Sequence, residues 1–341
     1  MLHPLHRLLP WLLCCLLLGA CERPPELTEL HGRTMGTSYS VKYLAGAAAP
    51  AAAALQEEIE RLLAAINKTM STYDPDSELS RFNRAPADDW VAVSVELYTV
   101  VAAARRISEL SDGAFDITVG PLVNLWGFGP QPPRDRVPPA AAIAAARERV
   151  GYRMLALRNQ PPALRKTRPD LYVDLSAIAK GYAVDRVAEL LERHAIRDYL
   201  VEIGGELRAS GRNAQASPWR VAVEKPLAGA RSVETVIAVE RGSIATSGDY
   251  RNFFEVDGQR YSHEIDPHSG WPIAHRLASV TVVADNCMEA DAWATALLVL
   301  GPQNGPALAE RLGLAALFIS GEADGFREHA TPAFVPYLTG P

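Results

Sequence analysis

Two polar side chains interrupt an otherwise apolar helix that is predicted near the C-terminal end of the chain. Asp291 and Thr295 lie four residues apart in CMEADAWATALLVL, and side chains with this spacing share one helix face. Asn286 can cap this helix and Glu289 can close a capping box, so Asp291 lies too deep in the helix to act as a cap. The pair either is structural, with the threonine bonding back to its own helix, or offers two oxygen ligands to a cation. So sparse a ligand set suits Mg²⁺, which keeps waters and takes substrate phosphates as ligands.

A second segment, VDLSAIAKGYAVD, has the residue types of a phosphate site. It places Asp174 at the end of a predicted strand and Lys180 in the first turns of a helix predicted over about 177–194. Backbone donors and a lysine near a helix N-terminus attract phosphate, and Gly181 permits close approach of a chain or ligand. The alternative is a surface lysine on an ordinary helix. No glycine-rich turn precedes Lys180, so the segment is not a Walker loop.

Three shorter segments carry weaker signals. GSIATSGDY, at 242–250, places serines and a threonine between glycines, which suits phosphate or ribose hydroxyls but also suits a simple turn. MGT, at 35–37, and GAFD, at 113–116, are uninformative when taken alone.

His263 is the candidate general acid or base. It lies in YSHEIDPHSG, where His263 and Glu264 resemble the start of a zinc-protease motif. The second histidine, His268, follows five residues later and Pro267 breaks any helix between them, so the two imidazoles would not share a helix face. We therefore disfavour zinc. His263 either titrates near physiological pH in a proton-transfer role or is a surface residue without a role.

Predicted strands and helices must position these residues. The strands outnumber the helices and do not alternate strictly with them, which indicates an α+β fold with mixed or antiparallel sheets and packed helices. Strands are predicted over 38–44, 171–175, 199–203, 219–223, 233–239, 253–256, 278–283 and 315–320. Helices are predicted around 55–66, from Ser94 onward, and over 177–194, 287–300 and 304–312. We expect a tether at 21–31, one domain at 32–325 and a C-terminal tail at 326–341.

The first 20 residues predict an exported signal peptide. Arg7 precedes a short apolar core, Trp11–Leu18, which is too short for an ordinary membrane span. The core ends in Leu-Gly-Ala-Cys, which resembles a bacterial lipobox and makes Cys21 the predicted lipidation site. Alternatives are cleavage near Ala20 and an uncleaved anchor. The glutamate after Cys21 resembles that of lipoproteins sent to the outer membrane in Gram-negative hosts.

Composition narrows the classes of partner. The formal net charge is −6 and no long basic run occurs, so a nucleic-acid partner is not expected. Of the four cysteines, two lie in the signal and one is the predicted lipid site, which leaves Cys287 and predicts no intrachain disulfide.

Eight segments in one order resemble the ApbE family of FAD:protein FMN transferases, over about residues 32–320. They are MGT, MSTYDPDSELSRFN, GAFDITVGPLVNLWGFGP, VDLSAIAKGYAVD, VEIGGELRASG, GSIATSGDYRNFF, YSHEIDPHSGWPIAH and ASVTVVADNCMEADAWATALLVLG. The resemblance implies binding of FAD and Mg²⁺, cleavage of the pyrophosphate, attachment of FMN to a Thr or Ser of a partner through a phosphoester, and release of AMP.

The same resemblance assigns site residues. The FAD site would comprise Met35, Tyr73, Ala114, Phe115, Asp116, Asp174, Lys180 and, through its backbone, Ile265. The metal ligands would be the Ala177 carbonyl, Asp291 and Thr295. His263 is the candidate base, with Asp291 a second participant through the metal. Glu264 and His268 depart from the usual family residues at their positions, and Glu264 is expected to alter metal preference or the pKa of His263.

Two other functions fit the same residues. One is an FAD pyrophosphatase that uses water as acceptor, and the other is a non-catalytic FAD-binding lipoprotein, against which Asp291, Thr295 and His263 argue. The family implies acceptor subunits of membrane redox complexes of the Na⁺-translocating NADH:quinone reductase or Rnf type. We expect a periplasmic protein, anchored to a membrane by lipid.

Overall fold

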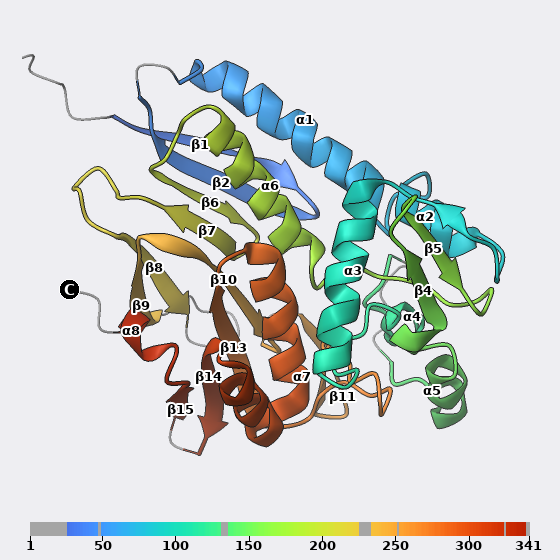
Figure 1. Cartoon of the computed structure of the whole chain (residues 1–341). Coiled ribbons are helices and arrows are strands. Elements are labelled where there is room, and N and C mark those ends of the chain that lie inside the picture. Colours follow the sequence, from blue (N-terminus) through green and yellow to red (C-terminus); the bar gives the residue numbers. More distant parts are fainter. Residues whose placement is uncertain are drawn as a thin grey trace, which may run out of the picture.

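One antiparallel sheet forms the centre of the computed structural model, which describes residues 26–46, 49–130, 136–224, 233–250, 252–323 and 325–338 (Figure 1). All neighbouring strands in this sheet run antiparallel. In spatial order the strands are β1 (Leu27–Thr34), β2 (Thr37–Leu44), β6 (Tyr199–Ile203), β7 (Glu206–Ser210), β10 (Arg241–Gly248), β13 (Leu277–Ala284), β14 (Ala315–Glu322) and β15 (Gly325–Ala330). The predicted α+β class is confirmed.

Three long helices cover one face of the sheet: α1 (Ala52–Met70), α6 (Ala179–Arg193) and α7 (Cys287–Leu312) (Figure 1). In α1, Leu55, Ile59, Leu63 and Ile66 form a buried stripe at helical spacing, as their periodicity predicts. In α7, almost every side chain from Ala290 to Leu298 is buried, because this helix lies between β10, β13 and α6.

The opposite face of the sheet carries a second core. Alternate strand residues supply it, since Ile244, Leu317 and Ile319 point away from the long helices. A hairpin of β8 (Trp219–Glu224) and β9 (Val233–Val239) covers this face, together with the short helix α8 (Val335–Leu338). Trp219 and Phe334 are buried there.

The remaining elements pack beside the main sheet. They are α2 (Glu78–Arg84), β3 (Val91–Ala92), α3 (Val95–Leu110), α4 (Gly120–Trp126), α5 (Ala140–Arg147), a 3₁₀ turn (Tyr152–Met154), β4 (Leu155–Arg158), β5 (Ala163–Lys166) and the hairpin β11 (Phe253–Val256)–β12 (Gln259–Ser262). Ser94 caps α3 as predicted. Within the described residues, no helix has both the length and the apolarity needed to cross a bilayer.

The predicted strand at 171–175 is wrong. The segment is buried and extended, but its backbone bonds to side chains and a loop in place of a neighbouring strand. The Asn83 amide donates to the Val173 carbonyl (2.9 Å) and accepts from the Val173 N–H (2.8 Å), while the Asp174 N–H donates to the Ile117 carbonyl (2.7 Å). The apolar, buried character of the segment indicated a strand, whereas its partners are the Asn83 side chain and a loop.

Two predicted boundaries and one loop segment also differ from the structure. The tether cannot extend to residue 31, because β1 begins at Leu27 and pairs with β2 along its whole length. Residues 326–338 are not a tail, because β15 belongs to the main sheet and Phe334 is fully buried. The segment 242–250, for which a simple turn was one of two alternatives, is mostly strand β10, whose small polar residues pair with β7 and β13. The signal peptide and Cys21 lie outside the described residues.

Helix α7 combines the two predicted helices at 287–300 and 304–312. Its backbone breaks at Gly301, where φ is 77°, a value that favours glycine. Asn286 caps the helix as predicted, accepting the Glu289 N–H at 2.9 Å. The predicted capping box is only half formed, because the Glu289 carboxylate pairs with Arg106 at 2.6 Å.

Candidate active site

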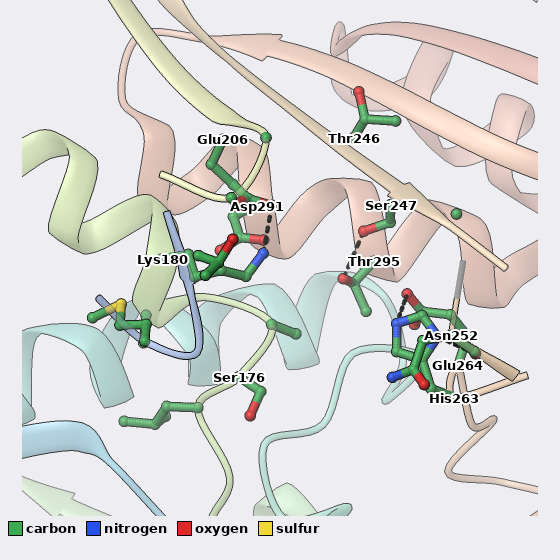
Figure 2. A pocket seen from close by; sticks show the side chains of 18 of the residues that line it. Ser176, Lys180, Glu206, Thr246, Ser247, Asn252, His263, Glu264, Asp291 and Thr295 are labelled. Atoms are coloured by element: carbon green, nitrogen blue, oxygen red, sulfur yellow. Dashed lines mark hydrogen bonds and ion pairs between the residues drawn. The ribbon is translucent and has the colours of Figure 1, made fainter. Parts of the chain in front are cut away.

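A cavity of about 1190 Å³ lies beside α6, α7 and β10 and is lined by every predicted catalytic, FAD-binding and metal-binding residue. These residues are Met35, Tyr73, Ala114, Phe115, Asp116, Asp174, Ala177, Lys180, His263, Ile265, Asp291 and Thr295. The cavity exceeds the usual range for small ligands and has room for a dinucleotide. In Figure 2, Thr295 lies between a group containing Lys180 and Asp291 and a group containing His263.

The close approach of α6 and α7 fixes Asp291. A Cβ added to Gly181 would lie 2.2 Å from the Cys287 carbonyl oxygen, so only glycine allows this separation of the two helices. The Gly181 N–H donates to Asp291 Oδ2 at 3.0 Å. Asp185, one turn further along α6, accepts the N–H groups of Cys287 and Met288 at 2.9 Å each. Asp291 is therefore held between two helices that are bonded to each other.

Lys180, Glu206 and Asp291 form a charged group in which both carboxylates are buried and the lysine is partly exposed to the cavity (Figure 2). Lys180 Nζ lies 2.5 Å from Glu206 Oε1. Burial alone would lower the pKa of Lys180, but the carboxylates of Asp291 and Glu206 outweigh burial and raise it. Burial raises the pKa of Glu206 to about 7 against the opposing effect of Lys180. It also raises the pKa of Asp291, which Lys180 and the Gly181 N–H oppose. One ammonium faces two carboxylates. The lysine therefore stays charged, and it is unfavourable for Glu206 and Asp291 to be ionised at the same time.

The predicted metal ligands fit a hard cation in donor type. The Gly181 N–H, which would bond to the Ala177 carbonyl in a regular helix, donates to Asp291 and leaves that carbonyl to other partners. The Thr295 hydroxyl lies 2.9 Å from Ser247 Oγ, so Ser247 can accept its proton and leave the oxygen lone pairs available to a cation. No cluster of three or more His, Cys, Asp or Glu side chains suited to a metal occurs in the described chain. A cation here would depend on one carboxylate, one hydroxyl, one carbonyl and ligands from water or substrate.

Asp116 lines the cavity, but its carboxylate is already bonded within the protein. That carboxylate accepts the Thr118 N–H, the Thr118 hydroxyl and the Tyr152 N–H, all at 2.7 Å. Burial raises the pKa of Asp116, and these three bonds oppose the rise. The stretch from Ala114 to Asp116 is therefore a braced loop, whose peptide groups are the parts available to a ligand.

Asp174 and Tyr73 occupy another side of the cavity. Asp174 is largely buried and accepts the Ser176 N–H at 2.8 Å. Tyr73 is 67 % exposed although it lines the cavity, which places it at the rim. Burial of its hydroxyl and then the charge of Asp174 raise the pKa of Tyr73, so the phenol stays protonated and can donate.

Met35 and Ile265 reach the cavity through unusual backbone. Met35 and Gly36 form the two-residue turn between β1 and β2 with φ values of 47° and 73°. Two-residue turns with positive φ favour Asn-Gly. Methionine is unfavourable in the first position, and such departures from local preference are typical of functional positions. Ile265 pairs with Pro272, but the flanking bonds are made by Glu264 and Asp266. The N–H and C=O of Ile265 therefore point away from Pro272. They are free for the FAD contact that was predicted through the backbone of this residue.

His263 has a defined tautomer. Its Nδ1 lies 3.0 Å from the Asn252 carbonyl, which only accepts, so Nδ1 carries the proton and Nε2 is the basic nitrogen. The backbone N–H of His263 donates to the same carbonyl at 3.0 Å. His268, the other histidine of the rejected zinc motif, is exposed and pairs with Asp266. A neutral imidazole with a free Nε2 in the cavity can accept a proton from a hydroxyl.

Two residues of the site were not predicted from the sequence. Glu206 follows the Gly204–Gly205 turn, where it resembles an ordinary strand residue. Ser247 was noted only as part of a polar segment, and its pairing with Thr295 depends on the contact between β10 and α7. A carboxylate directly after two glycines was the one available signal for Glu206.

These features define an enzyme site suited to phosphate chemistry on a dinucleotide-sized ligand. A model of the ApbE family matches residues 35–318, and the chain belongs to this family. The FAD:protein FMN transferase of Vibrio cholerae is 49 % identical over 324 residues, covering 95 % of this chain and 96 % of that protein. The enzyme of the same name from Escherichia coli K12 is 44 % identical, covering 92 % and 90 %.

Solved structures agree with the fold. The flavin transferase ApbE of Vibrio cholerae superposes with a TM-score of 0.87 at 48 % identity, covering 92 % of this chain and 100 % of that one. The apo form of the Pseudomonas stutzeri flavinyl transferase ApbE gives a TM-score of 0.85 at 44 % identity, covering 93 % and 98 %.

Proposed function

We propose that this protein transfers FMN from FAD to a Thr or Ser hydroxyl of a partner protein, in a Mg²⁺-dependent reaction that forms a phosphoester and releases AMP. The observation that carries the proposal is the meeting of Lys180, the donor set of Ala177, Asp291 and Thr295, and the free Nε2 of His263 in one cavity. The curated relatives at 49 % and 44 % identity, named FAD:protein FMN transferase, support the same reaction.

The roles of the residues follow from their chemistry. His263 Nε2 takes the proton of the acceptor hydroxyl, whose own nucleophilicity is low. The hydroxyl oxygen forms a bond to the FMN phosphorus, and the bond from that phosphorus to the AMP oxygen breaks with its electron pair leaving on AMP. Lys180 holds a fixed positive charge for the pyrophosphate. Mg²⁺ at the Ala177, Asp291 and Thr295 oxygens would supply charge neutralisation and orient the phosphates.

The backbone and side chains of the other lining residues would bind FAD. Met35, Asp174 and Ile265 come from three separate segments, and each is held by the local bonding described above. Tyr73 at the rim would donate its hydroxyl to the ligand.

We further propose that the protein is a periplasmic lipoprotein, anchored through lipid on Cys21 to the inner or the outer membrane. Its acceptors would be extracytoplasmic subunits of Na⁺-translocating NADH:quinone reductase or Rnf-type complexes. Support for the anchor comes from the apolar segment and Leu-Gly-Ala-Cys sequence. Cys21→Ser should release the protein from the membrane fraction of cells, and its retention there would contradict lipid anchoring.

Mass spectrometry of a recombinant acceptor domain tests the reaction. The purified protein is mixed with FAD, Mg²⁺ and a threonine-containing acceptor domain of an NADH:quinone reductase subunit, with and without EDTA. An FMN adduct that forms only without EDTA, and not on a Thr→Ala acceptor, is expected. Free FMN and AMP without an adduct on any acceptor would favour a pyrophosphatase, and intact bound FAD would leave only a flavin carrier.

A further inference from the structure

Glu264 lies beside the candidate base, at a position where the chain departs from the usual family residue. Its Oε1 is 3.6 Å from His263 Nε2, the nitrogen that the tautomer leaves free to accept a proton. Consecutive residues of a strand point to opposite faces, but β12 ends at Ser262 and the chain bends at His263. The bend allows both side chains to face the same cavity (Figure 2).

The backbone holds Glu264 firmly in this position. Its N–H donates to Ser262 Oγ at 3.1 Å, and its carbonyl accepts the Ile273 N–H at 2.9 Å. The side chain is only 12 % exposed, compared with 33 % for His263. A short, fixed separation between a carboxylate and an imidazole nitrogen is therefore built into the fold.

The charge of His263 affects the ionisation of the Glu264 carboxyl. Burial raises its pKa, the charges of His263 and Lys180 oppose the rise, and those of Asp291 and Asp249 add to it. Among the described side chains, the His263 imidazole is the basic group at ion-pair distance from this carboxylate. A buried carboxylate without a paired cation is costly, and a positive charge on the imidazole relieves that cost.

We propose that Glu264 is a positioning residue that stabilises the imidazolium formed when His263 Nε2 takes the proton of the acceptor hydroxyl. This inference rests on the proposed function. The proton moves from the hydroxyl oxygen to Nε2, and the positive charge that forms on the imidazole lies 3.6 Å from Glu264 Oε1. The carboxylate thus favours this product by its charge, without touching the substrate.

Histidine NMR titration of the purified protein, without FAD or metal, tests the pairing directly. The His263 resonances are assigned by their loss in His263→Gln. An opposite charge at this range raises a pKa by about 1 unit or more, so Glu264→Gln should lower the pKa of His263 by roughly 1 unit. Glu264→Asp, which keeps the charge, should retain part of the effect. Glu255→Gln is the matched control, since Glu255 is exposed on β11 of the same hairpin.

The pH profile of transfer tests the catalytic consequence. The base must be unprotonated, so the rate rises with pH through the pKa of His263. In Glu264→Gln this rise should move to lower pH by the same roughly 1 unit, with a lower plateau because the base is weaker. An unchanged His263 pKa would overturn the inference, and so would a changed pKa with an unmoved profile. Absence of any adduct with the wild-type protein, despite the NMR shift, would instead refute the proposed transferase.

Discussion

Gly181→Ala should damage the site by separating α6 from α7. The added Cβ would lie 2.2 Å from the Cys287 carbonyl oxygen and 2.8 Å from Met288 Cα, so the helices must move apart by about 1 Å. A shift of that size breaks the 3.0 Å bond from the Gly181 N–H to Asp291. Overpacking costs about 1–3 kcal/mol, loss of a bond to a carboxylate costs about 1.5–3 kcal/mol, and alanine returns about 1 kcal/mol of helix propensity. The net loss is about 2–5 kcal/mol.

Calorimetry and metal titration measure this effect together. The Tm should fall by roughly 4–20 °C, because each kcal/mol corresponds to about 2–4 °C in large domains. The concentration of Mg²⁺ needed for half-maximal transfer should rise, since Asp291 is no longer fixed. Gly46→Ala is the control, because Gly46 is exposed and its added Cβ meets nothing within 4 Å. A Tm within about 1 °C of the wild type, with unchanged Mg²⁺ dependence, would refute this account of the helix contact.

Two other substitutions test the predicted ligand contacts. Asp291→Ala should abolish Mg²⁺ binding in calorimetry and abolish transfer while leaving some FAD binding, and full turnover in Mg²⁺ would count against the metal assignment. Asn83→Ala leaves the buried Val173 N–H and carbonyl without their partner, at about 1–3 kcal/mol each, and should weaken FAD binding through Asp174. Asn159→Ala, at an exposed position, is its control, and unchanged FAD affinity in Asn83→Ala would show that Asp174 does not depend on this bond.

The sequence predicted elements best where one periodicity dominates. The bounds of β6 and β11 match the predicted 199–203 and 253–256, because apolar residues in these segments pack directly against a neighbouring layer. Strand β1 was missed because its charged and polar residues suit an exposed edge, where only Leu30 and Thr34 are buried. Strand β10 was missed because its glycine and serine are common in turns, and only pairing on both sides makes it a strand.

The candidate site was predictable as a set of residues but not as an arrangement. The spacing of Asp291 and Thr295 placed them on one face, as found, because helical geometry is local. Their connection to Gly181 and Ser247 depends on contacts between elements 110 and 48 residues apart, which no local pattern encodes. Asp116 was predicted as a binding residue, but its carboxylate accepts the N–H groups of Thr118 and Tyr152 and so stabilises the loop. The motif alone did not show this structural role.

Glu206 gives a pH dependence whose sign is fixed by its environment. Burial raises its pKa from 4.5 to about 7, so between these values the folded state holds more protons than the unfolded state. Its contribution to the free energy of unfolding is therefore present below pH 4.5 and falls by up to about 3 kcal/mol as the pH rises to 7. Gln has the shape of protonated Glu, can still accept from Lys180 and does not titrate. In urea unfolding with EDTA, the stability of Glu206→Gln relative to the wild type should thus rise by about 2 kcal/mol between pH 5.5 and 8. A difference that stays constant over this range would mean that Lys180 already holds Glu206 ionised, and that the two carboxylates do not compete for one ammonium.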